Sequence, residues 1–190
     1  MFGIIVDNSP SAILGPVSVF DHMQHAEEFR QTPIAGTYLR ILRFLGIIFS
    51  FIFMPFWYLC IKTGYIPFES ELFNIEETNN IFLQIILIEV GIELLRMASI
   101  HTPNALSTSM GLIAGIVIGN IAIDLGIFSN AIVFIGSISA IGTYITPSYE
   151  LGLANKISKI VLLLLIYIGG IWGFITGSLI LIWYLYSLKS

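Results

Sequence analysis

Five apolar stretches follow one another along the chain, separated by short polar segments. They cover residues 41–61, 80–99, 110–127, 130–146 and 160–188. At about 1.5 Å per helical residue, each is long enough to cross most or all of a bilayer core about 30 Å thick. The pattern predicts an all-α integral membrane protein, a bundle of about five transmembrane helices.

The composition favours the same class. Of the 190 residues, 56% are hydrophobic and 11% are charged, whereas soluble domains carry about 25% charged residues. The net charge of −4 provides no basic surface for nucleic acid. A single cysteine, Cys60, excludes an intrachain disulfide and a cluster of thiolate ligands.

Basic residues precede the first stretch and acidic residues follow it. The basic residues are Arg30, Arg40 and Arg43. The positive-inside rule therefore places the N-terminus in the cytoplasm, and Lys156 and Lys159 are expected in a cytoplasmic loop. Within the first stretch, Pro55 is expected to kink the helix, with Trp57 and Tyr58 near the outer interface.

The N-terminal part differs in character from the rest. Ile4 to Val6 predict a strand that runs into a turn, and a lone strand is not stable by itself. Residues 1–38 are therefore expected to be the C-terminal remnant of a cytosolic domain, followed by a transmembrane domain over 39–190. Within the remnant, residues 17–32 predict an amphipathic helix that Pro33 ends.

Residues 160–188 carry no charge and allow two arrangements. A single helix would be about 43 Å long and would place the C-terminus outside the cell. A break at Gly169-Gly170 would instead form a re-entrant hairpin and return the C-terminus to the cytoplasm. Gly169, Gly173 and Gly177 form a stripe of small residues suited to close helix contact.

The second stretch carries three ionisable residues, Glu89, Glu93 and Arg96, which we call the charged face. At about 100° per residue they fall within roughly 60° of arc. Such groups cost about 2.5–3.5 kcal/mol each on insertion scales and persist where they meet protein or water. The face is either a pathway or an internal register, with Glu93 paired to Arg96. Glu89 is the least matched, and Arg43 is a candidate partner.

The third stretch has a small-residue side and a polar side. Gly111, Gly115 and Gly119 recur every four residues, and Asn120 and Asp124 lie about 140–180° away. The small residues of 130–146 are expected to pack tightly against this stretch.

The polar side of the third stretch is a candidate pore wall. Ile113, Ile116 and Val117 lie on the same side as Asn120 and Asp124. An apolar ring next to a polar ring is what a dewetting gate requires. Interhelical hydrogen bonding by Asn120 and Asp124 is the alternative.

The chain carries no nucleophile elbow, metalloprotease pair, phosphate-binding loop or dinucleotide motif. His22, His25 and Glu28 share a helix face, but a fourth metal ligand is missing from the pattern. We therefore predict neither an enzyme nor a metal or cofactor site.

Four ordered motifs resemble the membrane region of the GerA family of spore germination proteins. They are FDHMQHAEEFRQTPIAGTYLRILRFLGI, EVGIELLRMA, GLIAGIVIGNIAID and TPSYELGLANKISK. The resemblance implies a multi-pass protein of the spore inner membrane that contributes to ion release during germination, as a subunit of a homo-oligomeric ion channel. A second small integral membrane germination protein is a further candidate partner. The alternative is a non-conducting scaffold for germination proteins.

Overall fold

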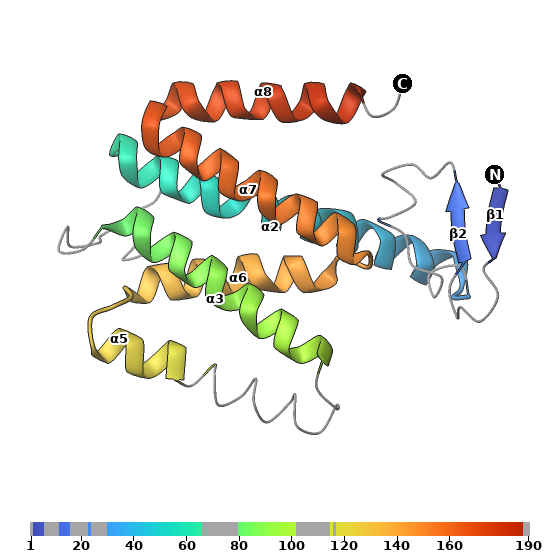
Figure 1. Cartoon of the computed structure of the whole chain (residues 1–190), viewed down its shortest axis with the longest axis horizontal. Helices are drawn as coiled ribbons and strands as arrows, with labels where there is room; N and C mark the ends of the chain where they lie inside the picture. The colour runs from blue at the N-terminus through green and yellow to red at the C-terminus, as the bar shows by residue number, and fades with distance from the viewer. Residues whose placement is uncertain are drawn as a thin grey trace.

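Long helices lying side by side make up most of the structure (Figure 1). The computed structural model describes residues 2–5, 12–15, 23, 30–65, 80–101, 115 and 117–187. The long helices are α2 (Pro33–Thr63), α3 (Ile81–His101), α6 (Asn130–Ile145), α7 (Tyr149–Gly169) and α8 (Ile171–Ser187). Between α3 and α6 lie the π-helix η2 (Val117–Ile121) and the short helix α5 (Ala122–Asp124).

Two helices, α2 and α7, are long and apolar enough to cross a membrane. Helices α6 and α8 are apolar but shorter, with 16 and 17 residues. Helix α3 has 21 residues but carries the charged face. The predicted helical class is therefore confirmed and the apolar helices indicate membrane association, while the number of five spans stays a prediction.

The bundle core is formed by side chains from α2, α3, α6 and α7. Its fully buried members are Met54, Ile85, Ile132, Ile135, Leu162, Leu163 and Ile166. Trp57 and Tyr58 belong to the same core and are only 2% and 6% exposed. Large rings bury much apolar area between helices, and the expected position of these two near the outer interface stays a prediction. Helix α2 continues unbroken through Pro55.

Glycines allow the closest approach between helices in this core. A Cβ added at Gly142 of α6 would lie 2.5 Å from the Gly46 carbonyl oxygen and from Ser50 Cβ on α2. One added at Gly136 would lie 3.0 Å from the Ile88 side chain on α3. Gly142 and Gly136 of α6 therefore face α2 and α3, whereas Ser137 and Ala140 line a cavity together with Gly115 and Gly119 of the third stretch. The predicted tight packing of α6 against that stretch stays a prediction.

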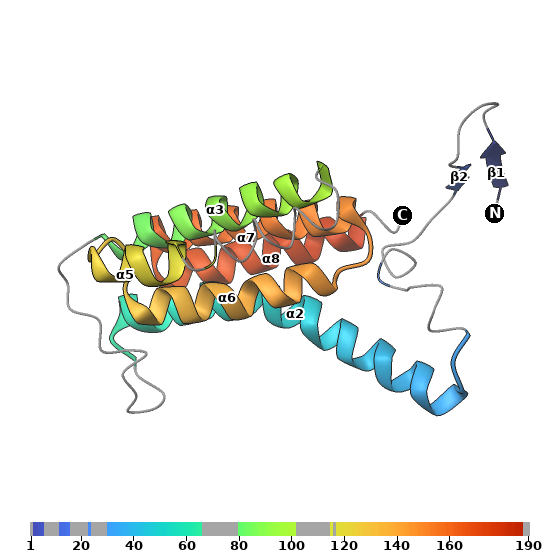
Figure 2. The same cartoon turned by 90° about the horizontal axis from the view of Figure 1, so that it is seen from below.

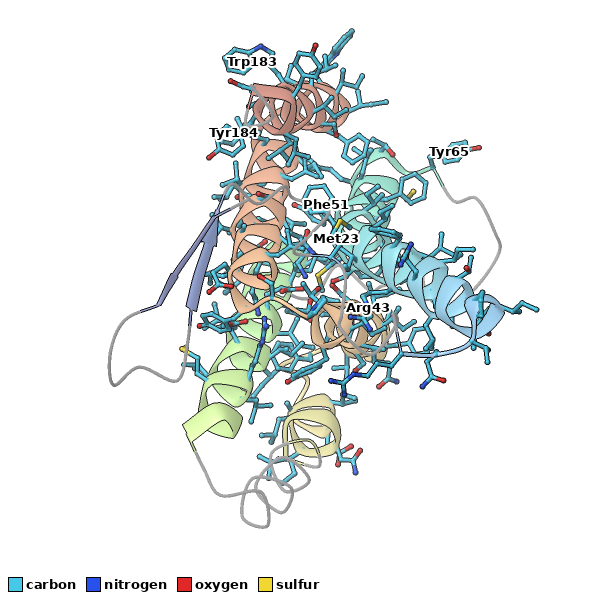
Figure 3. The ribbon with its side chains drawn as sticks, turned by 90° about the vertical axis from the view of Figure 1, so that its right-hand side faces the viewer. Met23, Arg43, Phe51, Tyr65, Trp183 and Tyr184 are labelled. Carbon is cyan, nitrogen blue, oxygen red and sulfur yellow. The ribbon has the colours of Figure 1, made fainter. Side chains whose placement is uncertain are left out.

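The chain reverses between α7 and α8 at Gly170, which has φ 58° and ψ −129°. A positive φ is strained for residues with a Cβ, so glycine suits this turn. Helix α8 folds back so closely that a Cβ at Gly173 would lie 1.9 Å from the Leu165 carbonyl oxygen. Of the two arrangements expected for 160–188, the structure has the break. Trp183 and Tyr184 project outward from α8 (Figure 3).

The N-terminal strand has a partner that the sequence analysis missed. Strand β1 (Phe2–Ile5) pairs antiparallel with β2 (Ala12–Gly15), beyond the end of the helical bundle (Figure 2). Pro33 begins α2, where its fixed φ and missing N–H suit the first helical turn. Residues 17–32 lie outside the described residues except Met23 and Arg30–Thr32, so His22, His25 and Glu28 do too.

Replacing Gly173 by alanine tests the close packing of α8. The added methyl group would clash with the Leu165 carbonyl oxygen, so we expect a loss of about 1–3 kcal/mol, measured as a lower Tm in detergent. Gly169→Ala is the matched control, because a Cβ there meets nothing within 4 Å. Equal Tm values for the two variants would contradict the hairpin packing.

Candidate functional site

Helix α3 turns the charged face toward the interior of the bundle. Ile85, Ile88 and Glu89 follow one another at helical spacing. The face of α3 that places Ile85 and Ile88 in the core therefore also carries Glu89. Glu89 is 2% exposed and Arg96 is 9% exposed. Carboxylates and guanidinium groups at such depth require partners.

The partner of Glu89 is Lys159 of α7. The Lys159 ammonium donates to Glu89 Oε1 at 2.6 Å and to Ser139 Oγ at 2.8 Å. Both ionised side chains are almost completely buried, with 3% and 2% of their surface exposed. These two bonds from one ammonium group, shielded from water, link α3, α6 and α7 at one point.

The second lysine of α7 completes the pairing. Lys156 Nζ lies 2.9 Å from Glu93 Oε2 and 3.7 Å from Glu89 Oε2. Lys156 and Lys159 are three residues apart, and Glu89 and Glu93 are four apart, so each pair shares one face of its helix. The lysine face of α7 therefore lies against the glutamate face of α3, and the opposite charges of the two faces pair in a ladder.

Hydroxyl groups extend this ladder to α2. Ser139 Oγ donates to the Ser50 carbonyl oxygen at 3.1 Å, and Ser50 Oγ donates to the Ser139 carbonyl oxygen at 2.8 Å. The Ser50 and Thr143 hydroxyl groups lie 2.9 Å apart. We call Glu89, Glu93, Lys156, Lys159, Ser139 and Ser50 the polar network. It joins α2, α3, α6 and α7 across the middle of the bundle.

Arg96 does not form the ion pair that the sequence suggested. Its guanidinium lies 5.2 Å from the centre of the Tyr149 ring and fits against Gly152, where a Cβ would be 2.9 Å from Nη1 and Nη2. Among the described residues, Arg96 Nη1 and Glu93 Oε1 have no hydrogen-bond partner. Glu93 pairs with Lys156 in place of Arg96.

Two assignments made from the sequence are therefore wrong. Lys156 and Lys159 lie inside α7 and are buried, not in a cytoplasmic loop, and Lys159 rather than Arg43 is the partner of Glu89. The two lysines three residues apart and the two glutamates four residues apart each share one helix face. These spacings were the signal that could have identified the pairing.

The candidate pore residues lie apart from the polar network. Val117 and Asn120 belong to η2 and Asp124 to α5, and all three are exposed. Ile113, Ile116 and Gly111 lie outside the described residues. Cβ atoms at Gly115 and Gly119 would meet nothing within 4 Å, so this part of the predicted glycine stripe makes no such close contact with the described residues.

The polar network is suited to fixing the positions of helices. Each lysine has a carboxylate partner, and the Ser139 hydroxyl both accepts from Lys159 and donates to α2. No group of three metal-ligating side chains occurs in the part of the chain that the structure describes. The arrangement therefore favours the register interpretation of the charged face over the pathway interpretation.

Removing one member of the central ion pair should be strongly destabilising. Lys159→Met leaves Glu89 buried without its cation, and we expect a loss of about 3–5 kcal/mol, seen as a large fall in Tm. The double variant Lys159→Met with Glu89→Gln removes both charges and should recover much of the loss. If the double variant melts no higher than Lys159→Met, the two residues are not coupled in the way the distance implies.

Comparison with known proteins gives consistent matches. The family described as "Bacillus/Clostridium GerA spore germination protein" matches residues 1–190. Stage V sporulation protein AF of Bacillus subtilis (strain 168) is 49% identical over 98% of this chain and 38% of its own length. Spore germination protein GerIA of Bacillus cereus is 31% identical over 98% of this chain and 29% of its own.

The chain thus spans about 38% of the length of the first of these relatives and 29% of the second. Spore germination protein A1 of Bacillus subtilis (strain 168) is 30% identical over 93% of this chain. No solved structure gives a significant match. Because the family match covers the whole chain, this protein belongs to the GerA family of spore germination proteins.

Proposed function

We propose that this chain is a subunit of an oligomeric ion channel that contributes to ion release during spore germination. The observation that supports this most directly is the exposure of Asn120 and Asp124 among apolar neighbours. Ile121 and Leu125, which flank them, are 49% and 69% exposed. An ionised carboxylate on such a surface is costly in lipid, so it requires water or a polar partner.

The closed polar network supports a pathway between subunits and not one through the middle of each subunit. Lys156 and Lys159 neutralise both glutamates of the charged face, and their side chains are 6% and 3% exposed. A conducting path needs accessible polar groups, and Asn120 and Asp124 supply them on the outside of the bundle. Copies that meet at η2 and α5 would enclose this surface.

The proposed gate combines the π-helix with apolar side chains. Val117, 45% exposed, starts the π-helical turn that contains Asn120. Single π-helical turns are rare and are frequent at functional sites. Val117, with Ile113 and Ile116, would form the apolar constriction next to the polar ring of Asn120 and Asp124.

The proposed role is non-enzymatic and its setting is the spore inner membrane. The relatives named as sporulation and germination proteins support the spore, and the apolar helices α2 and α7 support the membrane. With the N-terminus in the cytoplasm, as the basic residues before α2 favour, the reversal at Gly170 would return the C-terminus to the cytoplasmic side.

A non-conducting scaffold is the second candidate. The first half of α2 extends beyond the other helices of the bundle (Figure 2). Its apolar side chains are open to contact: Ile34 is 87% exposed and Leu45 is 58% exposed. Other copies of this chain, or a second small integral membrane germination protein, would cover this surface in either role.

Asp124→Asn tests the channel proposal. A carboxylate about 4 Å from a passing cation contributes about 1 kcal/mol in a watery pore, so its loss should lower cation preference about fivefold. The measurement is the reversal potential of the full chain reconstituted in bilayers under a salt gradient. Glu150→Gln is the matched control, since it removes an exposed carboxylate from α7.

Val117→Ala should make the same channel leaky, because a smaller side chain widens the hydrophobic constriction and lets water enter it. We expect higher basal ion flux from vesicles and earlier ion efflux from spores. Properly assembled protein that never conducts, with wild-type efflux from Val117→Ala spores, would instead favour the scaffold.

A further inference from the structure

A cavity of about 410 Å³ opens where the ends of α2, α3 and α7 meet. Aromatic rings of Tyr58, Phe82 and Tyr167 line it, together with the Lys62 ammonium and the side chain of Asn80. The cavity is open to the surface, and its lining combines apolar side chains with a few polar groups, as ligand sites do. The polar network contributes no residue to it.

Lys62 holds the end of α7 and has donor capacity left over. Its Nζ donates to the Ile166 carbonyl oxygen at 2.9 Å and to the Tyr167 carbonyl oxygen. These carbonyls belong to the last turn of α7, where few intrahelical donors remain, and the Ile166 carbonyl oxygen also accepts from the Gly170 N–H at 2.8 Å. An ammonium group has three N–H donors, and among the described residues these two carbonyls are the acceptors that Lys62 meets. The ammonium also lies 5.4 Å from the centre of the Tyr167 ring, and its third donor, which meets no acceptor among the described residues, can reach a ligand in the cavity.

The walls beside Lys62 are aromatic and apolar. The Phe82 and Tyr167 rings stack with centroids 4.4 Å apart, and Tyr58 lies 6.0 Å from Phe82. Ile61 and Ile81 complete the apolar lining. A ligand for this site would therefore present a negative group to Lys62 and an apolar part to the rings.

The position of the cavity identifies which ligand combines these features. Lys62 lies near the end of α2 and Tyr167 near the end of α7, the two helices long enough to cross a membrane. In a bilayer these ends lie at the headgroup level, where basic and aromatic side chains gather. We propose that the cavity binds an anionic phospholipid, with its phosphate at Lys62 and Asn80 and its glycerol and chain along the rings.

This inference rests on the membrane placement of the bundle and not on conduction. Two other anions could occupy the same donors. One is free inorganic phosphate. The other is a carboxylate of this chain, since the sequence between Lys62 and Asn80 contains Glu69, Glu71, Glu76 and Glu77. The test separates these occupants.

The full chain is reconstituted in bilayers of phosphatidylcholine with and without phosphatidylglycerol, and native mass spectrometry counts the lipids retained per protomer. We expect Lys62→Gln to retain phosphatidylglycerol about fivefold less well, and Lys62→Arg to stay close to wild type. Thr63→Val, at the neighbouring position of α2, is the matched control and should retain lipid normally.

Asn80 provides a test that leaves the Lys62 contacts with α7 intact. Asn80→Lys should raise phosphatidylglycerol retention and Asn80→Asp should lower it, a pair of opposite effects that a structural role alone does not produce. Unchanged retention in Lys62→Gln and in both Asn80 variants would overturn the proposal and favour the internal carboxylate. If inorganic phosphate raises the Tm in phosphatidylcholine alone as much as phosphatidylglycerol does, the lipid assignment is wrong.

Discussion

The ion pair between Lys159 and Glu89 is the interaction on which the arrangement of the bundle depends. The 2.6 Å contact joins α7 to α3, and the 2.8 Å bond from the same ammonium to Ser139 brings in α6. Taking two charges out of water costs several kcal/mol per ion, and the attraction repays this only in good geometry with further hydrogen bonds. Sliding either helix by one residue would separate the partners. The pair therefore specifies the register of three helices, α3, α6 and α7, whereas apolar packing alone tolerates several registers.

The molecule has two separate polar features, and the closed network is one of them. One lies inside the bundle and is neutralised by its own lysines, so it stabilises a single arrangement. The other, at Asn120 and Asp124, lies on the surface and belongs to a π-helical turn and the short helix after it. In the proposed channel the first would keep each subunit rigid, and the second would be completed only by neighbouring subunits.

Much of the local structure could be predicted from the sequence. Residues 41–61, 80–99 and 130–146 correspond to α2, α3 and α6, and the glycine pair at 169–170 ends α7. The inward orientation of Glu89 could be expected, because its charge excludes it from lipid. The partner of Glu89 could not be predicted. Lys156 and Lys159 resemble the flanking charges of a cytoplasmic loop when only their position along the chain is considered. Their burial becomes intelligible once α3 lies opposite them.

The amino-acid sequence by itself determined the helical class, the apolar stretches and the family, and it offered a reversal at Gly169-Gly170 as one of two arrangements. These properties follow from residues close together along the chain, through periodicity, length and the conformational freedom of glycine. The tertiary structure alone decided which helices touch and which charges pair. Glu89 and Lys159 are 70 residues apart, and Lys62 reaches a carbonyl 104 residues away. The reason is physical: a charge requires a partner in space, and its sequence neighbours on one helix cannot show where that partner lies.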